Sequence, residues 1–171
     1  MKKTVVVTNR LIKLGVSKIS DLLNNKFSNT SESPVFVSIL QGGNIFCHDL
    51  MSSVDFKYAY DSIEVKSYKE QQQGELKLIK QPTFNLSNKK IILVDDFFDS
   101  GKTMFYVINY LKEHYENIKI TPVTFLKRQS KIELEGLIYC YLIQDESWLY
   151  GYGLDLDGEY RDKREIFKLE K

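Results

Sequence analysis

The chain has 171 residues, of which 43% are hydrophobic, so it is long enough to bury the core of one domain of ordinary size. Its formal net charge of +1 argues against a general nucleic-acid or membrane surface. No apolar run approaches membrane-spanning length and no secretory leader is recognisable, so we expect a cytoplasmic protein. The two cysteines, Cys47 and Cys140, lack metal-ligand spacing and are expected to be reduced thiols.

Apolar segments with strand and helix periodicity alternate along the chain, which predicts an α/β fold with a wound, mostly parallel sheet. A helix is expected around residues 19–27, and a short one after the Gly42-Gly43 turn. Lys66–Lys77 is rich in Gln, Lys and Glu and lacks core residues, so on composition alone it is a polar hairpin tip. Strands are expected at residues 35–40, 56–68 (one or two strands), 74–78, 91–94, 120–126 and 137–143.

The most informative stretch is KIILVDDFFDSGKTM at residues 90–104. Ile91–Val94 is a continuous apolar run, typical of a strand buried on both faces of a parallel sheet. Asp95 and Asp96 follow at its carboxyl end, where open α/β sheets bind their ligands. Two adjacent acids at that place can hold a divalent cation or the hydroxyls of a sugar.

A turn follows these acids and opens a helix, because apolar residues recur from Met104 onward at helical spacing. The free N–H groups and the dipole of such a helix start favour a phosphate dianion, so the stretch predicts a site for a phosphorylated sugar. A helix cap would explain one acid of the turn but not Asp95 and Asp96 as well. A nucleotide-binding P-loop fails because its first glycine position holds Asp96. The turn consists of Asp99, Ser100, Gly101, Lys102 and Thr103.

Residues 90–104 resemble the phosphoribosyl-pyrophosphate (PRPP) signature of the type I phosphoribosyltransferases. Four further segments match in the right order and narrow the resemblance to the hypoxanthine-guanine (6-oxopurine) group. They are Val35–Gly43, Val65–Gly74, Phe125–Arg128, and Trp148–Asp155 together with Tyr160–Asp162. The resemblance implies the type I fold over residues 1–171 as a single domain. It also implies a small hood formed by the N-terminal segment and about residues 144–171, and a mobile β-hairpin lid at about residues 66–77.

The resemblance assigns roles around PRPP to the acids, the turn and two loops. Asp95 and Asp96 would hold the ribose hydroxyls and a magnesium ion, and the turn from Asp99 to Thr103 would bind the 5′-phosphate. Asp99 is implied to be the general base that takes the N7 proton of the purine as N9 attacks. Gln41, Gly42 and Arg161 are implied to contact the pyrophosphate. Ser67 and Tyr68 correspond to the Ser-Tyr pair of the family's lid. Many relatives carry a basic residue at position 41, so Gln41 removes a charge from this loop.

Four further residues are assigned to the purine side of the site by the resemblance. Lys127 would donate to the 6-oxo oxygen, and Trp148 would stack on the base. Leu149 would offer backbone groups to the base edge, and Asp155 would hold a second magnesium ion. Without the resemblance, Lys127 and Asp155 are unremarkable surface charges and Trp148 is an ordinary packing aromatic.

The sequence therefore leads us to expect a magnesium-dependent purine-salvage enzyme. It would convert PRPP and hypoxanthine or guanine to a purine nucleoside monophosphate and pyrophosphate. A xanthine preference stays open, as does a non-catalytic PRPP-sensing regulator that binds nucleic acid. The near-neutral charge, Asp99 and the Ser67-Tyr68 pair argue against the regulator. We expect no nucleic-acid or membrane partner, and relatives suggest a homodimer or homotetramer.

Overall fold

A computed structural model of the chain describes residues 3–68 and 75–169. Strands and helices alternate at first, a β-hairpin follows in the middle of the chain, and the last helix is followed by four strands. In chain order they are β1 Lys3–Val7, α1 Asn9–Phe27, β2 Val35–Leu40, α2 Gly43–Met51, β3 Ala59–Tyr68, β4 Glu75–Lys80, β5 Lys90–Phe98, α3 Lys102–His114, β6 Lys119–Arg128, β7 Ile138–Ile143, β8 Leu149–Tyr150 and β9 Ile166–Leu169.

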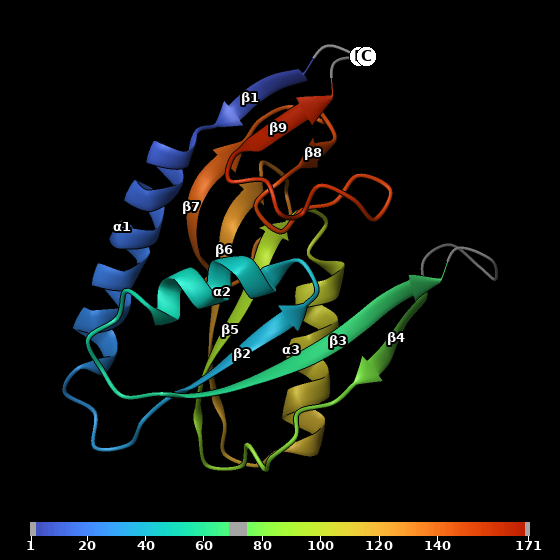
Figure 1. Cartoon of the computed structure of the whole chain (residues 1–171). Coiled ribbons are helices and arrows are strands. Elements are labelled where there is room, and N and C mark those ends of the chain that lie inside the picture. The colour runs from blue at the N-terminus through green and yellow to red at the C-terminus, as the bar shows by residue number, and fades with distance from the viewer. Residues whose placement is uncertain (1–2, 69–74, 170–171) are drawn as a thin grey trace.

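The central sheet has six strands in the order β4-β3-β2-β5-β6-β7. All neighbouring pairs are parallel except β3 and β4, which confirms the mostly parallel sheet. Helices α1 and α2 cover one face of this sheet and α3 covers the other (Figure 1). Among the described residues, no helix is long and apolar enough to cross a membrane.

Strand β5 forms because its first half is apolar on both sides. Ile92 and Val94 pack into the cluster beneath α1 and α2, while Ile91 and Leu93 pack into the cluster beneath α3. This alternation follows from the two-residue period of a strand. Burial of each such side chain stabilises the fold by about 1.5–3 kcal/mol. The two cores together fix the position of the acidic residues that follow.

Strand β5 extends further than the sequence indicates, because it ends at Phe98. Asp95 and Asp96 therefore lie inside the strand rather than beyond its end. The reason is unequal pairing: β2 pairs with β5 only as far as Val94, whereas β6 stays paired up to Phe98. Asp95 and Asp96 are thus the first residues of β5 after its pairing with β2 ends.

A second sheet of three strands, in the order β1-β9-β8, joins the two ends of the chain. Lys3 pairs with Leu169 and Leu149 pairs with Lys168, both in antiparallel register. Figure 1 shows this small sheet at the end of the molecule toward which the arrows of β5 and β6 point. Its strands come from the segments expected to form the hood, but a hood role over a bound substrate stays a prediction.

The hairpin expected in the middle of the chain is formed by β3 and β4, with Lys66 opposite Lys77 and Ser67 opposite Leu76. The returning arm runs over Glu75–Lys80, and β3 begins at Ala59 rather than near Phe56. Residues 69–74, the centre of the expected lid, lie outside the described residues. The lid role therefore stays a prediction.

Candidate active site

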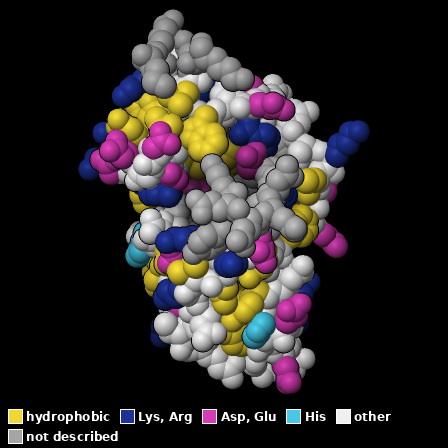
Figure 2. Space-filling view, turned by 90° about the vertical axis from the view of Figure 1, so that its right-hand side faces the viewer, with side chains coloured by type: hydrophobic (Ala, Val, Ile, Leu, Met, Phe, Trp, Pro, Cys, Tyr) yellow, Lys and Arg dark blue, Asp and Glu magenta, His cyan; other side chains and the backbone are white. Residues whose placement is uncertain are grey.

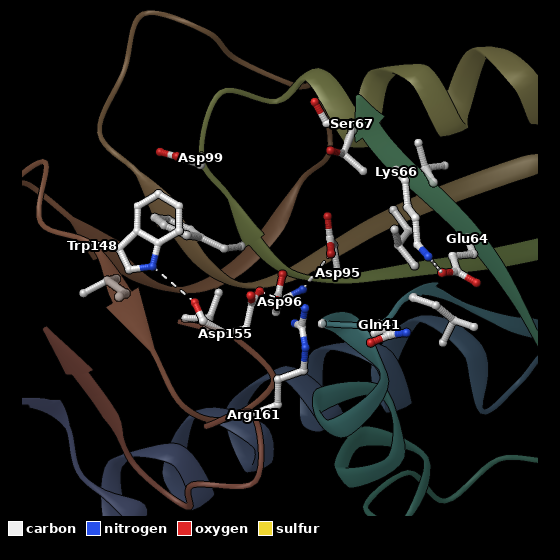
Figure 3. Close-up of a pocket in the computed structure, with 18 of the residues that line it drawn as sticks. Gln41, Glu64, Lys66, Ser67, Asp95, Asp96, Asp99, Trp148, Asp155 and Arg161 are labelled. Atoms are coloured by element: carbon white, nitrogen blue, oxygen red, sulfur yellow. Dashed lines mark hydrogen bonds and ion pairs between the residues drawn. The ribbon is translucent and has the colours of Figure 1, made fainter. Parts of the chain in front are cut away.

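A cavity of about 770 Å³ opens where the parallel strands end, between β2, β3 and β5 on one side and the 148–161 segment on the other (Figure 3). Most of the residues assigned from the sequence meet in it, although they come from four separate parts of the chain. The predicted residues that line it are Gln41, Gly42, Ser67, Asp95, Asp96, Asp99, Thr103, Trp148, Leu149, Asp155 and Arg161.

Asp95 and Asp96 form an acidic pair in contact with each other. Asp95 is 7% exposed, and its Oδ1 accepts the backbone N–H of Asp96 at 3.0 Å. Burial raises the pKa of the Asp95 carboxyl well above its usual range, and the charge of Asp96 raises it further. Burial also raises the pKa of Asp96, against the opposing effect of the Arg161 charge. Because desolvation disfavours their charged forms, a bound cation would stabilise both ionised carboxyl groups.

Replacing Asp95 by Asn should therefore stabilise the fold in the absence of ligand. The pKa of Asp95 is higher in the folded chain than in the unfolded one, so ionisation destabilises the fold once the pH exceeds the unfolded value of about 3.9. The gain from Asp95→Asn should vanish at lower pH, where the carboxyl is protonated in both states. The gain should grow as the pH rises toward the folded pKa.

The measurement is the thermal midpoint as a function of pH, in which each kcal/mol corresponds to about 2–4 °C for a domain of this size. An Asp95→Asn variant that melts at a lower temperature than the wild type at pH 8 would show that ionised Asp95 does not destabilise the fold.

The loop after β2 comes very close to this acidic pair. The peptide bond between Leu40 and Gln41 is cis. A Cβ atom on Gly42 would lie 1.9 Å from Asp96 Oδ2, and one on Gly153 would lie 2.3 Å from the carbonyl oxygen of Gly42. Only glycines allow both approaches without a shift of their neighbours. The loop is thus held between the acids of β5 and the 151–154 turn.

The turn before α3 encloses a second, smaller cavity of about 50 Å³. Gly101 precedes the helix with a φ of 75°, a conformation that favours glycine. The helix then begins at Lys102, so its unpaired N–H groups belong to this turn. All five predicted turn residues line this cavity, and two of them, Asp99 and Thr103, also line the larger one.

The segment after β8 carries a chain of polar contacts centred on Asp155. Trp148 Nε1 donates to the Asp155 carbonyl at 3.2 Å, and the Trp148 residue is 61% exposed. Arg161 pairs with Asp155 Oδ1 at 2.7 Å and also donates to the Gly153 carbonyl at 2.6 Å. Figure 3 shows Arg161 pointing toward Asp96 and Asp155. One guanidinium thus connects the acidic pair to the tryptophan segment.

Lys127 is the one predicted purine-binding residue that the structure does not bring to the cavity. Its ammonium donates to both carboxylate oxygens of Glu133, at 2.9 and 2.8 Å, and lies over the ring of Tyr139. Consecutive strand residues point to opposite faces. Its neighbour Arg128 therefore faces the cavity and is among the residues that line it.

Sequence reasoning missed several residues of the cavity. Strand alternation favours opposite directions for the side chains of Lys127 and Arg128, and this pattern was the available signal for Arg128. Along β3 no such signal was available, because the four consecutive residues Glu64–Ser67 all line the cavity. The missed residues with charged or aromatic side chains are Glu64, Lys66, Phe97, Arg128 and Asp157.

Comparison with known proteins connects this geometry to a family. Residues 8–156 match the family model of the phosphoribosyl transferase domain. The chain belongs to the phosphoribosyltransferase family. The hypoxanthine-guanine phosphoribosyltransferase of Streptococcus pyogenes serotype M3 is 30% identical over 134 residues, which cover 77% of this chain and 74% of that protein.

Two further comparisons support the family and its fold. The hypoxanthine phosphoribosyltransferase of Buchnera aphidicola is 25% identical over 166 residues, which cover 94% of this chain and 93% of that protein. A solved structure of a hypoxanthine phosphoribosyltransferase from Staphylococcus aureus has a TM-score of 0.86 at 24% identity, covering 98% of this chain and 91% of that chain. The structural likeness confirms the type I phosphoribosyltransferase fold that the sequence predicts.

The charges in the cavity of this phosphoribosyltransferase are unbalanced. Its lining holds six carboxylates (Glu64, Asp95, Asp96, Asp99, Asp155 and Asp157) but three cations (Lys66, Arg128 and Arg161). Each cation already pairs with a carboxylate: Lys66 with Glu64, Arg128 with Asp99, and Arg161 with Asp155. A strongly anionic ligand such as PRPP would be repelled by the remaining acids unless a metal cation entered with it.

The residues present fit such a metal. Among the described residues, no three His, Cys, Asp or Glu side chains are grouped to hold an ion by themselves. Mg²⁺ does not need such a cage, because it is usually bound by one or two carboxylates together with waters and substrate phosphates. Asp95 and Asp96 supply two carboxylates side by side, whereas Asp155 is engaged by Arg161. A second-metal role of Asp155 stays a prediction.

Proposed function

We propose that this chain transfers the 5-phosphoribosyl group from PRPP to N9 of hypoxanthine or guanine, forming IMP or GMP and pyrophosphate with Mg²⁺ as cofactor. The observation that supports this proposal most is that three structural features line one cavity. A paired acid site, the turn at the start of α3 and an exposed tryptophan all line it. The names of the curated relatives support the same substrate class.

The geometry supports an arrangement of PRPP along the cavity. The 5′-phosphate fits the small cavity at the start of α3, where helix N–H groups favour an anion. The ribose then lies over Asp95 and Asp96, and the pyrophosphate lies against the loop of Gln41 and Gly42 with Arg161 close by. Bound Mg²⁺ would neutralise the charge of the leaving pyrophosphate.

The side chains can then act on both partners of the reaction. As the bond from C1′ to pyrophosphate breaks, positive charge builds on the ribose, and the carboxylates of Asp95 and Asp96 stabilise it electrostatically. Asp99, whose side chain is 56% exposed, accepts the N7 proton as N9 attacks. Trp148 stacks on the purine and Leu149 offers backbone groups to its edge. Ser67 on β3 lines the cavity, so it supports a lid that excludes water.

Binding at this place can be tested directly because Trp148 is the only tryptophan in the sequence. We expect IMP and GMP to change its fluorescence in a saturable manner, since a stacked purine contacts the indole face. Ribose 5-phosphate, which has no base, serves as the control and should leave the emission nearly unchanged. Absence of a saturable change with millimolar IMP or GMP would contradict the assigned base site.

Adenine should be a poor substrate. The 6-oxo oxygen accepts a hydrogen bond from Lys127, whereas the 6-amino group of adenine is itself a donor. The mismatch is worth about 1–3 kcal/mol, or about tenfold to a few hundredfold in kcat/KM. Lys127 does not line the cavity in this structure, so for this role its ammonium must leave Glu133 and turn into the cavity.

Initial rates with each purine measure this preference. Lys127→Ala should lower kcat/KM for hypoxanthine more than for adenine, while Trp148→Ala should weaken all purines alike. Efficient turnover of adenine by the wild type would contradict the 6-oxopurine assignment and leave the PRPP site intact.

The regulator alternative receives no support from the visible surface. A protein that binds nucleic acid presents a basic face. On the face shown in Figure 2, Lys and Arg side chains are interspersed with Asp and Glu side chains. We therefore keep the enzyme as the proposal, together with a cytoplasmic location and a homodimer or homotetramer.

A further inference from the structure

Arg128, at the end of β6, contacts four residues from two other parts of the chain. Its Nε pairs with Asp99 Oδ1, its Nη1 donates to the carbonyl of Asp145, and its Nη2 donates to the carbonyl of Ser147 at 3.4 Å. The guanidinium also lies 4.9 Å from the centre of the Phe97 ring. Its side chain is only 16% exposed.

These partners belong to the two sides of the proposed reaction. Asp99 stands at the start of the phosphate-binding turn, and Ser147 immediately precedes the stacking residue Trp148. The planar guanidinium presents its donors in a fixed fork, so it sets the distance between the groups it bonds. One side chain thereby connects the proton acceptor to the segment that carries the base-stacking surface.

The ion pair leaves Asp99 able to react. Arg128 contacts Oδ1, and a carboxylate has a second oxygen with its own lone pairs. Because the Asp99 side chain is 56% exposed and lines the cavity, a ligand there can reach its carboxylate. The bond therefore orients the carboxylate without occupying its whole capacity to accept a proton.

We propose that Arg128 is a positioning residue that fixes Asp99 and the 145–148 segment relative to each other, so that the purine N7 proton meets Asp99 Oδ2. This inference rests on the proposed function, because it assigns Arg128 an effect on the same proton transfer. It concerns the transfer step rather than PRPP binding. Lys127, on the opposite side of the strand, has no part in it.

A double-mutant cycle between Arg128 and Asp99 tests the proposal. Arg128→Gln should lower kcat by about 10–100-fold, the scale of a misplacement of about 1 Å, while KM for PRPP changes little. In Asp99→Asn the positioned group has lost its function, so adding Arg128→Gln should cost almost nothing more. Arg128→Lys keeps the charge but lacks the fork, and its kcat should lie between Gln and the wild type. Lys131→Gln removes a charge from an exposed site nearby and should leave activity unchanged.

Trp148 emission provides a readout that does not depend on turnover. Arg128→Gln releases the carbonyls that precede Trp148, so its emission should change, whereas Asp99→Asn should leave it nearly unaltered. Multiplicative losses of kcat in the double variant, or an Arg128→Gln variant as active as the wild type, would overturn the proposal. If Arg128→Gln does not fold, the same cycle with Arg128→Lys decides the outcome. A wild type that forms no nucleotide would instead contradict the proposed function.

Discussion

Asp99→Asn is expected to lower kcat for hypoxanthine by about 10²–10⁴-fold, the usual range for the loss of a general base. Asn keeps the size of the side chain and can accept the Arg128 hydrogen bond through its oxygen, but it cannot take a proton. The affinity for PRPP should change little, because Asp95 and Asp96 remain. The measurement is steady-state kinetics with PRPP and hypoxanthine varied separately.

Asp162→Asn is the matched control for this experiment. Its carboxylate is 82% exposed and does not line the cavity, so the same chemical change there should leave kcat within about twofold of the wild type. A fully active Asp99→Asn variant would show that another group accepts the N7 proton. A loss confined to KM for PRPP would assign Asp99 to the binding of the 5′-phosphate instead.

Removal of Mg²⁺ is expected to lower kcat/KM for PRPP by about 10³-fold or more, since a bound metal ion contributes several kcal/mol of charge stabilisation. The physical reason is the excess of carboxylates over cations in the cavity, which repels the phosphates of PRPP. Activity should return when Mg²⁺ is added in excess over the chelator. Full activity in the presence of chelator would contradict a metal-bound substrate.

The acidic pair provides a sharper form of this test. Asp96→Asn should raise the Mg²⁺ concentration needed for half-maximal activity, because one of two adjacent carboxylates is lost. Asp157→Asn removes a carboxylate that lines the same cavity without belonging to the pair, and it is the matched control. Equal shifts of the Mg²⁺ requirement in both variants would indicate a general charge effect rather than a site at Asp95 and Asp96.

Much of the fold could be predicted because its signals are local. The apolar run Ile91–Val94 indicates a strand buried on both faces, and the spacing from Met104 to Leu111 indicates the helix after it. The turn between them brings its five residues around a small cavity, as the start of a helix requires. The alternation of strand and helix signals in the first two thirds of the chain also indicates a mostly parallel sheet.

Other features depend on contacts between residues distant in the chain. The small sheet pairs Lys3 with Leu169, and nothing in either short segment identifies the other. The extent of β5 depends on where β2 and β6 stop pairing with it, so the placement of Asp95 inside the strand could not be read locally. The cavity faces of Glu64 and Lys66 are set by the register of the hairpin.

The neighbours Lys127 and Arg128 show this limit most clearly. The resemblance assigned the purine contact to Lys127, but which of two consecutive strand residues faces the cavity depends on the tertiary structure. The position of Glu133, six residues further along the chain, decides which partner the Lys127 ammonium finds. The family pattern could predict the segment but not the partners of its side chains.

Identification of the product tests the central claim most directly. The protein is incubated with PRPP, Mg²⁺ and hypoxanthine or guanine, the nucleotide is separated and identified by its mass, and pyrophosphate is quantified in the same sample. We predict IMP from hypoxanthine and GMP from guanine, each formed in equal amount with pyrophosphate, and little AMP from adenine. Formation of no nucleotide from either 6-oxopurine, or of AMP as readily as IMP, would contradict the account.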